Sequence, residues 1–178
     1  MHLRAGLLQD RTNDALVVED NELAYTHAGL TYSISGVSSG TVSDGSKFIL
    51  TMQTPDGYPE IHARVEAIGK FAFFFRIIEG VDIVTSGSEV IPVNKNRNSA
   101  NLSNVKTRFN DVTSNGDVIF SMYQVSGQLS GGVYAQPSKR ILKQNTVYVF
   151  ELESDANSNI LSGLIEFQEV WSVYGGAV

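Results

Sequence analysis

The chain has 178 residues, 42% of them hydrophobic, which suits one globular domain with a buried core. Its net charge is −6 and its thirteen Lys and Arg are scattered, which argues against nucleic-acid binding. The lack of cysteine excludes disulfides, thiolate catalysis and cysteine-ligated zinc. The opening MHLRAGLLQD has no apolar run of signal-peptide length, and the longest apolar run, FAFFF, is too short to span a bilayer. We therefore expect a soluble protein that is made in the cytoplasm and does not contact a membrane.

Residues 1–28 mix apolar clusters with charged stretches and keep no regular period. Leu7 and Leu8 form one cluster and LVV at 16–18 forms another. Either this segment is a poorly ordered terminus, or it is an arm whose apolar clusters dock on a neighbouring subunit. We assign residues 1–28 to an N-terminal arm, with Leu7 and Leu8 as candidate partner contacts, and residues 29–178 to one β domain.

From Leu30 onward, apolar and polar residues alternate in short runs, which is the pattern of half-buried strands. The first runs are TYSI and KFILTMQT, separated by the loop sequence SGVSSGTVSDGS. PDGYP at 55–59 predicts a turn, because Pro presets φ and Gly57 accepts a positive φ.

The stretch 60–80, EIHARVEAIGKFAFFFRIIEG, has the strongest alternation in the chain. It predicts two strands joined by a two-residue type II′ turn at Gly69-Lys70, and so a β-hairpin. Phe71, Phe73 and Phe75 fall on one face of the second strand. Because such large rings need burial, we expect this hairpin at the centre of a sheet, with the three rings buried.

The second half of the chain repeats the pattern in SNVKTRFNDVT, DVIFSMYQV, NTVYVFELES and GLIEFQEVWSVY. Asn115-Gly116 between two of these runs is a further hairpin signal. No window has sustained apolar spacing of three and four residues, so we expect no long helix. Short strands between polar turns predict an all-β, single-domain β-sandwich, jelly-roll-like, with about eight or nine strands.

Two motifs resemble known catalytic or metal-binding patterns. Gly36–Gly40 matches the G-x-S-x-G nucleophile elbow, but the helix that this motif requires does not follow, so a loop is favoured. Asp155–Glu166 places oxygen ligands at the first, third, fifth and twelfth positions of an EF-hand loop. Ile160 replaces the required Gly and strands flank the loop, so a polar turn is favoured, and a weak Ca²⁺ site stays open.

The three histidines, His2, His27 and His62, lie far apart in the sequence and have no metal-ligand spacing. No other group of residues matches a catalytic arrangement. We therefore predict a protein with no catalytic residue, no metal and no cofactor.

The least ordinary segment is the loop at 94–104. Its amide side chains alternate with basic and hydroxyl residues: Asn94, Asn96, Asn98, Asn101 and Asn104 beside Lys95, Arg97 and Ser99. Amides both donate and accept, so the loop is either held rigid by its own hydrogen bonds or offers a polar surface to another protein or a sugar. The candidate partner-binding residues in it are Asn94, Asn96, Arg97, Asn98 and Ser99.

The sequence IPVNKNRNS at 91–99, preceded by IEG at 78–80, resembles a P-x-N-x-N-R-x-S pattern in small structural proteins of tailed bacteriophages. Those proteins are encoded with the head genes and are thought to decorate or cement the capsid. The resemblance spans roughly Ile61 to Val173. It implies an all-β, non-enzymatic protein on the capsid surface of the virion, bound to the major capsid protein. Because capsids offer three-fold positions, we expect a homo-oligomer in the form of a trimer.

Two other functions stay open. Jelly rolls frequently bind sugars, so the chain fits a carbohydrate-binding module or a tail or baseplate accessory domain. Trp171 has Val170 and Val173 as neighbours, which places it in the core by pattern; an exposed Trp171 beside exposed tyrosines would favour sugar binding. The third function is an enzyme such as a glycosidase or a cupin-type metalloenzyme, and the missing histidine cluster argues against cupin chemistry.

Overall fold

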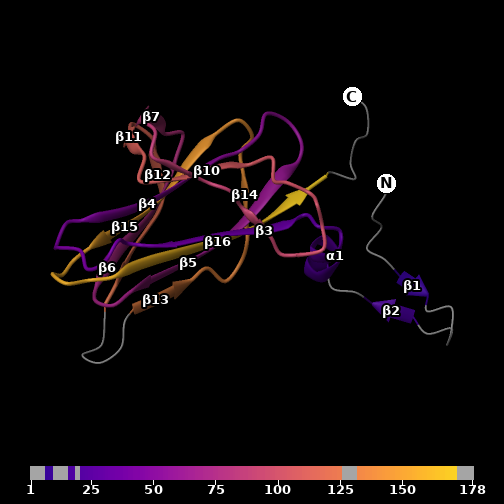
Figure 1. Ribbon diagram of the computed structural model, residues 1–178, viewed down its shortest axis with the longest axis horizontal. Coiled ribbons are helices and arrows are strands. Elements are labelled where there is room, and N and C mark those ends of the chain that lie inside the picture. The colour runs from indigo at the N-terminus through magenta and orange to yellow at the C-terminus, as the bar shows by residue number, and fades with distance from the viewer. Residues whose placement is uncertain (1–6, 10–15, 19–20, 126–131, 172–178) are drawn as a thin grey trace.

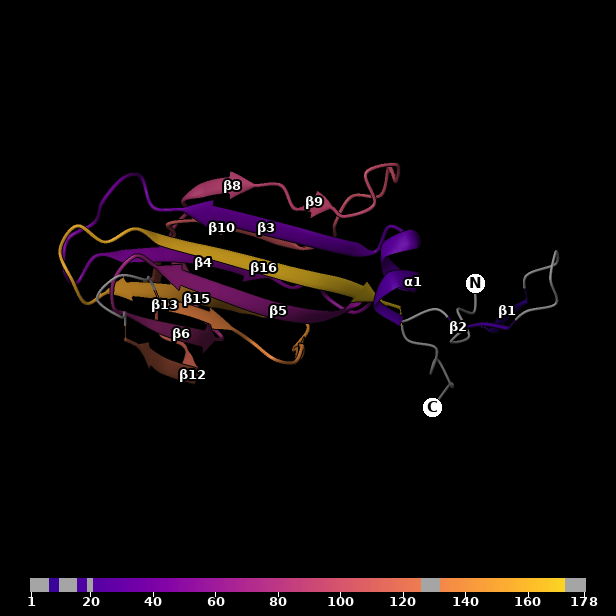
Figure 2. The ribbon, with the colours of Figure 1, turned by 90° about the horizontal axis from the view of Figure 1, so that it is seen from below.

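The computed structural model describes residues 7–9, 16–18, 21–125 and 132–171 of the chain. Two six-stranded antiparallel sheets pack face to face around one hydrophobic core (Figures 1 and 2). The predicted all-β fold is confirmed, and the two sheets form a sandwich. The predicted number of strands is not confirmed, because the described residues contain strands β1 to β16, several of them very short.

Sheet 1 has the strand order β13-β5-β16-β3-β9, and β14 extends the β13 edge by also pairing with β5. Its strands are β3 (Thr31–Val37), β5 (Glu60–Gly69), β9 (Val93–Asn94), β13 (Gly132–Ala135), β14 (Arg140–Leu142) and β16 (Leu161–Val170). The long strands β5 and β16 pair along their whole length and form the middle of the sheet.

Sheet 2 has the strand order β12-β6-β15-β4-β10-β8. Its strands are β4 (Lys47–Gln53), β6 (Phe73–Glu79), β8 (Ser88–Val90), β10 (Lys106–Phe109), β12 (Asp117–Gln124) and β15 (Val147–Ser154). Strand β15 lies between β4 and β6 and pairs with both along its length.

Three smaller elements accompany the sandwich. Strand β1 (Leu7–Gln9) pairs with β2 (Leu16–Val18), and β7 (Asp82–Thr85) pairs with β11 (Val112–Ser114). Helix α1 (Asn21–His27) has seven residues and lies at the end of sheet 1 where β3 begins and β16 ends (Figure 2). No helix in the described part of the chain is long and apolar enough to cross a membrane.

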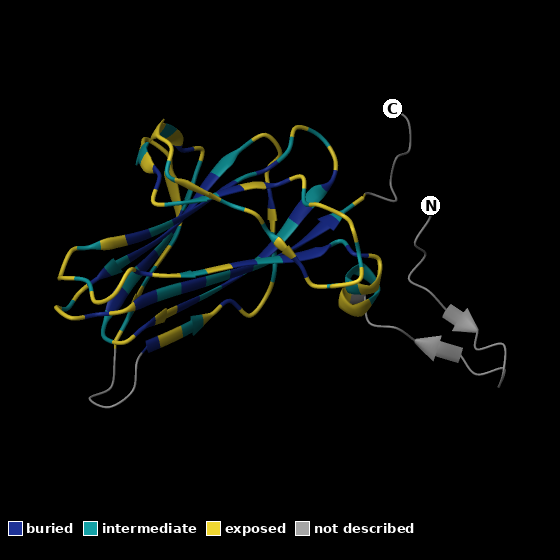
Figure 3. Ribbon diagram, viewed as in Figure 1, coloured by how far each residue is buried: buried dark blue, intermediate teal, exposed yellow. Residues whose placement is uncertain are grey.

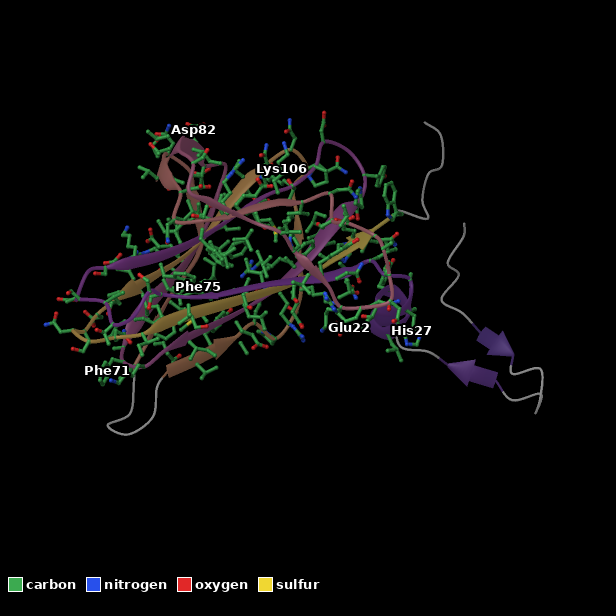
Figure 4. The ribbon with its side chains drawn as sticks, viewed as in Figure 1. Glu22, His27, Phe71, Phe75, Asp82 and Lys106 are labelled. Carbon is green, nitrogen blue, oxygen red and sulfur yellow. The ribbon has the colours of Figure 1, made fainter. Side chains whose placement is uncertain are left out.

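Alternation along the strands turns every second side chain toward the opposite sheet (Figure 3). In β6, Phe73, Phe75 and Ile77 are buried in the core, whereas Phe74 and Arg76 on the other face are half-buried. This confirms the burial predicted for Phe73 and Phe75, and Figure 4 shows Phe75 in the interior of the sandwich.

A glycine of sheet 1 makes room for aromatic rings of sheet 2. A Cβ atom at Gly36 would collide with the ring of Phe109 and lie only 3.0 Å from the ring of Phe48. These two rings are themselves in contact, with centroids 5.6 Å apart. The close approach of the two sheets at this point therefore depends on a residue without a side chain.

The predicted hairpin at 60–80 is wrong, although its two strands are present. Strand β5 lies in sheet 1 and β6 lies in sheet 2, so the chain crosses from one sheet to the other between them. Lys70 N donates to the carbonyl of Ile160 at 2.9 Å, instead of closing a two-residue turn. The error has a physical reason: alternation specifies which face of a strand is buried, but it does not specify the partner strand.

The corner between β5 and β6 also explains the position of Phe71. Phe71 is half-buried and lies at the end of the sandwich, far from Phe75 (Figure 4), so the burial predicted for it is only partly correct. The ammonium group of Lys70 lies 4.8 Å from the centroid of the Phe71 ring. A side chain at Gly69 would collide with the ring of Phe73, so this glycine permits the tight corner.

The hairpin predicted at Asn115-Gly116 is likewise absent. Both residues have the positive φ that such a turn requires, 59° at Asn115 and 93° at Gly116. The strands on either side pair elsewhere, however, β11 with β7 and β12 with β6. The dipeptide therefore supplies a sharp change of direction between two sheets.

Candidate functional site

The loop at 94–104 meets helix α1 at one end of the sandwich (Figure 2). Asn94 is buried at the start of this loop. Its Nδ2 donates to the carbonyls of Gly29 at 2.9 Å and Asn101 at 3.1 Å, and its Oδ1 accepts from Asn96 N at 2.9 Å. One amide side chain thus connects the start of the loop both to Asn101 within the loop and to Gly29, two residues after the end of α1.

Two further amides bind the carbonyl groups at the end of α1. A helix leaves its last carbonyls without intrahelical partners. Asn96 Nδ2 donates to the carbonyl of His27 at 2.9 Å, and Asn101 Nδ2 lies 3.3 Å from the carbonyls of both Ala28 and Gly29. The loop therefore caps the helix.

The loop also bonds to itself. Asn98 N donates to Asn96 Oδ1 at 3.1 Å, Ser99 N donates to the Asn96 carbonyl at 3.0 Å, and Asn101 N donates to Ser99 Oγ at 3.2 Å. These bonds support the interpretation of a loop held rigid by its own amides. They leave Asn94 and Asn96 with mainly structural contacts.

Arg97 and Asn98 are the exposed residues among the candidate contacts of this loop; Asn96 and Ser99 are half-buried. A hollow of about 520 Å³ lies between the loop and the helix, lined by Thr26, His27, Lys95, Asn96, Arg97 and Asn98. Its rim is basic and polar, so it suits a partner that presents carboxylates or amides.

Lys95 connects this rim to the outer face of sheet 1. Its Nζ lies 2.6 Å from Glu166 Oε1, and Arg64 donates to the other oxygen of the same carboxylate. Burial alone would raise the pKa of Glu166, but the hydrogen bonds and charges of Lys95 and Arg64 outweigh it and lower that pKa. The ion pair therefore fixes the base of the loop on β16.

Leu7 and Leu8, the other candidate contacts, lie in β1, where they pair with Val18 and Val17 of β2. Their side chains lie outside the described residues. Strand β2 precedes α1 in the chain, so the helix that the loop caps is also the connection to this strand pair. The structure thus brings the loop and the helix together by hydrogen bonds, and the helix belongs to the segment assigned to an arm.

A second hollow at the same end was not predicted from the sequence. Strand β16 turns Leu161, Ile165 and Phe167 into the core, and the same alternation turns Glu169 inward. Glu169 is buried, and it lines a hollow together with Trp171, whose side chain is 52% exposed. The expectation of a buried Trp171 is therefore wrong, because β16 ends at Val170 and Trp171 lies beyond its last pairing. The sequence feature that could have indicated this hollow is Glu169, an acidic residue at an inward-facing position of β16.

The possible Ca²⁺ ligands are occupied by other contacts. Asn159 is fully buried, and its side chain bonds to Phe71 N, Ala72 O, Ser154 Oγ and Ile160 N. Glu166 is held by Lys95 and Arg64, and Asp155 accepts a hydrogen bond from the hydroxyl of Tyr123 at 2.5 Å. Among the described residues, no group of three or more His, Asp or Glu side chains is placed to hold a metal.

The other motifs have structural contacts. Ser38 of the G-x-S-x-G match is buried, donates to the carbonyl of Gly40 at 3.0 Å and accepts from Leu161 N at 3.2 Å. It therefore holds the loop after β3 against β16. His62 lies on β5 with its Nε2 3.6 Å from Glu60, and His2 lies outside the described residues.

Comparison with protein-family models, with curated proteins and with solved structures finds no match to this chain. The functional argument therefore depends on the geometry of the two hollows and on the residues around them.

Proposed function

We propose that this protein is a non-enzymatic structural protein of a tailed-bacteriophage virion, which binds the major capsid protein and decorates the capsid. The observation that carries the proposal is the capping of helix α1 by Asn96 and Asn101. Through these bonds, the loop that resembles the decoration-protein pattern is attached to the helix that follows the apolar N-terminal clusters. Two candidate contact elements that are far apart in the sequence thus belong to one end of the sandwich.

The rigidity of this end suits association with a repeating shell. Internal hydrogen bonds order the loop before it meets a partner, so binding loses less conformational entropy. Arg97 and Asn98 remain exposed for intermolecular contacts, and Arg is enriched among residues that dominate binding energy. When subunits of an oligomer are linked, binding of one subunit raises the effective concentration of the others at the shell. Each individual contact can therefore be weak while the oligomer binds tightly.

Jelly-roll connectivity is part of the same proposal. The chain alternates between sheets in successive pairs: β3 and β4, β5 and β6, β12 and β13, and β15 and β16 each lie in opposite sheets. The orders β13-β5-β16-β3 in sheet 1 and β12-β6-β15-β4 in sheet 2 are those expected of two interleaved Greek keys. Jelly rolls occur in viral capsid proteins and in lectins, so the fold alone favours neither function.

We also propose that the protein acts as a homo-oligomer, a trimer matched to the three-fold positions of a capsid. Among the residues that the structure describes, no strand pairs with the outer sides of edge strands β8 and β12 of sheet 2 and β9 of sheet 1, and a neighbouring copy would cover these sides. Analytical ultracentrifugation of the full chain tests this part, and a monomer at micromolar concentration would contradict it.

Co-sedimentation of the full chain with undecorated phage capsids tests capsid binding. We expect saturable binding by the natural sequence and at least about tenfold weaker binding by Arg97→Ala combined with Asn98→Ala, the loss typical of one interface hot spot. Leu7→Asp combined with Leu8→Asp tests the arm in the same assay.

Lys106→Ala is the matched control for these variants, because Lys106 is an exposed cation on β10 of the other sheet (Figure 4). Its binding should equal that of the natural sequence. Equal binding by the loop variant and the control would remove the loop from the contact. No binding by the natural sequence would reject capsid decoration.

Carbohydrate binding, as a separate module or as a tail or baseplate accessory domain, is the second candidate function. The exposed indole of Trp171 favours it, because an exposed aromatic ring beside a hollow is a stacking surface for a sugar. The tyrosine that lines that hollow, Tyr32, is buried, so the expected arrangement of an exposed Trp171 beside exposed tyrosines is present only in its first half.

A further inference from the structure

The hollow beside Trp171 lies where β3 begins and β16 ends, close to helix α1 (Figure 1). It has a volume of about 310 Å³, the size of a small ligand pocket. Trp171 and Leu102 form its exposed rim, with 52% and 80% of their surface accessible. Leu30 continues the apolar wall inward. One side of this hollow is therefore apolar and accessible to solvent.

The floor of the hollow is a buried carboxylate. Glu169 is 1% exposed, and it accepts hydrogen bonds from Ser103 Oγ at 2.8 Å, Asn104 N at 2.7 Å and Asn104 Nδ2 at 2.8 Å. Two of these bonds reach Oε1 and one reaches Oε2. A carboxylate accepts about four hydrogen bonds, so Oε2 retains capacity for one more donor.

The charge of this carboxylate has no cationic partner among the ion pairs of the described residues. Its effect reaches Tyr32, since burial and the charge of Glu169 together raise the pKa of the Tyr32 phenol to about 12. The hollow is thus a negative environment, which disfavours an anionic ligand.

We infer that this hollow binds a neutral saccharide ring, stacked on the indole of Trp171, with hydroxyl groups bonded to Glu169 and to the amides of Asn101 and Asn104. A sugar ring has one face of C–H groups and an edge of hydroxyls, which matches an apolar wall beside polar acceptors. Asn101 uses its Nδ2 on Ala28 and Gly29, and Asn104 uses its Nδ2 on Glu169. Their amide oxygens receive no hydrogen bond from the described residues, so they are acceptors for sugar hydroxyls.

An organic cation is the competing ligand, because an indole and a carboxylate also attract ammonium groups. The geometry favours the sugar for two reasons. Three donors already stabilise the charge of Glu169, and the other aromatic residue, Tyr32, is buried and uses its hydroxyl to donate to the Gly29 carbonyl at 3.2 Å. The hollow therefore offers one ring to stack on and no aromatic cage.

This inference is independent of capsid binding and gives the second candidate function a defined site. Trp171 is the single tryptophan of the chain, so its fluorescence reports on the hollow alone. We expect a saturable change in this fluorescence when the full chain is titrated with the neutral methyl glycosides of glucose, galactose, mannose and N-acetylglucosamine. At least one should bind, and sodium glucuronate should bind at least about tenfold more weakly than methyl glucoside because of the charge of Glu169.

Variants at the exposed rim test the contact without disturbing the core. We expect Leu102→Ala and Trp171→Ala to keep the melting temperature of the natural sequence and to weaken binding of the best glycoside at least about tenfold by calorimetry. Tyr58→Ala is the matched control, because Tyr58 is a similarly exposed aromatic residue outside the hollow, and it should bind normally. Glu169→Gln should improve glucuronate binding relative to the neutral glycosides, provided that the variant keeps its fold.

Three results would overturn the proposal. The first is no saturable change with any of the four glycosides. The second is glycoside binding by Trp171→Ala equal to that of the natural sequence. The third is saturable binding of tetramethylammonium with no glycoside binding, which would make the hollow a cation site. Because these titrations contain no capsid, their failure and the failure of co-sedimentation are separate outcomes.

Discussion

The side-chain amide of Asn96 donates a hydrogen bond of 2.9 Å to the backbone carbonyl of His27. The two residues are far apart in the sequence, one in the loop after β9 and the other in the last turn of α1. The bond adds to other contacts that attach helix α1 to the sandwich, among them the ion pair between Glu22 and Lys139. It also makes the conformation of the loop and the stability of the helix depend on each other.

The first prediction tests this dependence. Asn96→Ala should lower the free energy of unfolding by about 1 kcal/mol, the typical worth of a lost hydrogen bond. It should also speed hydrogen exchange of the amides of Ala28, Gly29 and Leu30, which bond to carbonyls within the helix. Asn98→Ala is the control, since Asn98 is exposed and contributes its backbone rather than its side chain to the loop bonds. Unchanged exchange in Asn96→Ala would show that the cap does not hold the helix.

The second prediction concerns Asn159, whose side chain joins the corner after β5 to the turn between β15 and β16. Asn159→Ala would leave the half-buried amide of Phe71 without its partner and would remove the hydrogen bonds of Asn159 to Ser154 Oγ and to the Ala72 carbonyl, which keeps its bond from Asp155 N. Since an unsatisfied donor costs about 1–3 kcal/mol and each further lost hydrogen bond about 1 kcal/mol, we expect a loss of roughly 2–5 kcal/mol in urea denaturation. Asn157→Ala, at an exposed position of the same turn, should cost less than about 1 kcal/mol. Equal losses in the two variants would contradict the assignment.

The third prediction concerns the core beneath the same corner. Phe73 is fully buried, so Phe73→Ala should lower the free energy of unfolding by about 3–5 kcal/mol. Gly69→Ala should also destabilise, by about 1–3 kcal/mol, because its new methyl group would meet the Phe73 ring. In the double variant the new methyl group no longer meets the Phe73 ring, although it still lies close to the Phe71 carbonyl oxygen. The loss of stability in the double variant should therefore be smaller than the sum of the two single losses. Strict additivity in thermal or urea unfolding would argue against the contact.

The fourth prediction concerns pH. The pKa of Glu166 is lowered in the folded protein, so its ion pairs with Lys95 and Arg64 stabilise the fold above the unfolded value of about 4.3. This contribution disappears as the pH falls from about 4.3 through the lower folded pKa. Glu166→Gln should therefore be less stable at pH 7, and its stability should fall less steeply below about pH 4. Glu89→Gln, at an exposed position of β8, should follow the natural sequence. Parallel curves for Glu166→Gln and the natural sequence would exclude this role.

The sequence pattern predicts where the long strands lie, but it does not predict which strands pair with each other in a sheet. The alternation in 60–80 predicted β5 and β6 and the burial of Phe73 and Phe75, because burial of one face is a local property of a strand. The sequence of this stretch does not predict that the chain passes from sheet 1 to sheet 2 at Gly69-Lys70, because that crossing depends on residues near Ile160. Asn115-Gly116 likewise predicts the backbone geometry of a turn, but it does not predict which strands the flanking segments pair with.

The candidate site was only partly accessible from the sequence. The amide-rich loop was identified, but its bonds to Ala28 and Gly29 depend on a short helix that has too few residues to show a period. Glu169 could have been found, because it follows Ile165 and Phe167 at the same spacing on the buried face. The sequence pattern places Trp171 in the core, because alternation alone does not show where a strand stops pairing.

The strand order has a consequence for synthesis of the protein on the ribosome. The middle of each sheet comes from the last long strands, since β16 separates β3 from β5 and β15 separates β4 from β6. During translation, four apolar strands therefore leave the ribosome before either central partner exists. The nascent chain must keep them apart until residues 147–170 have emerged, so we expect that folding begins late and that chaperones bind the growing chain.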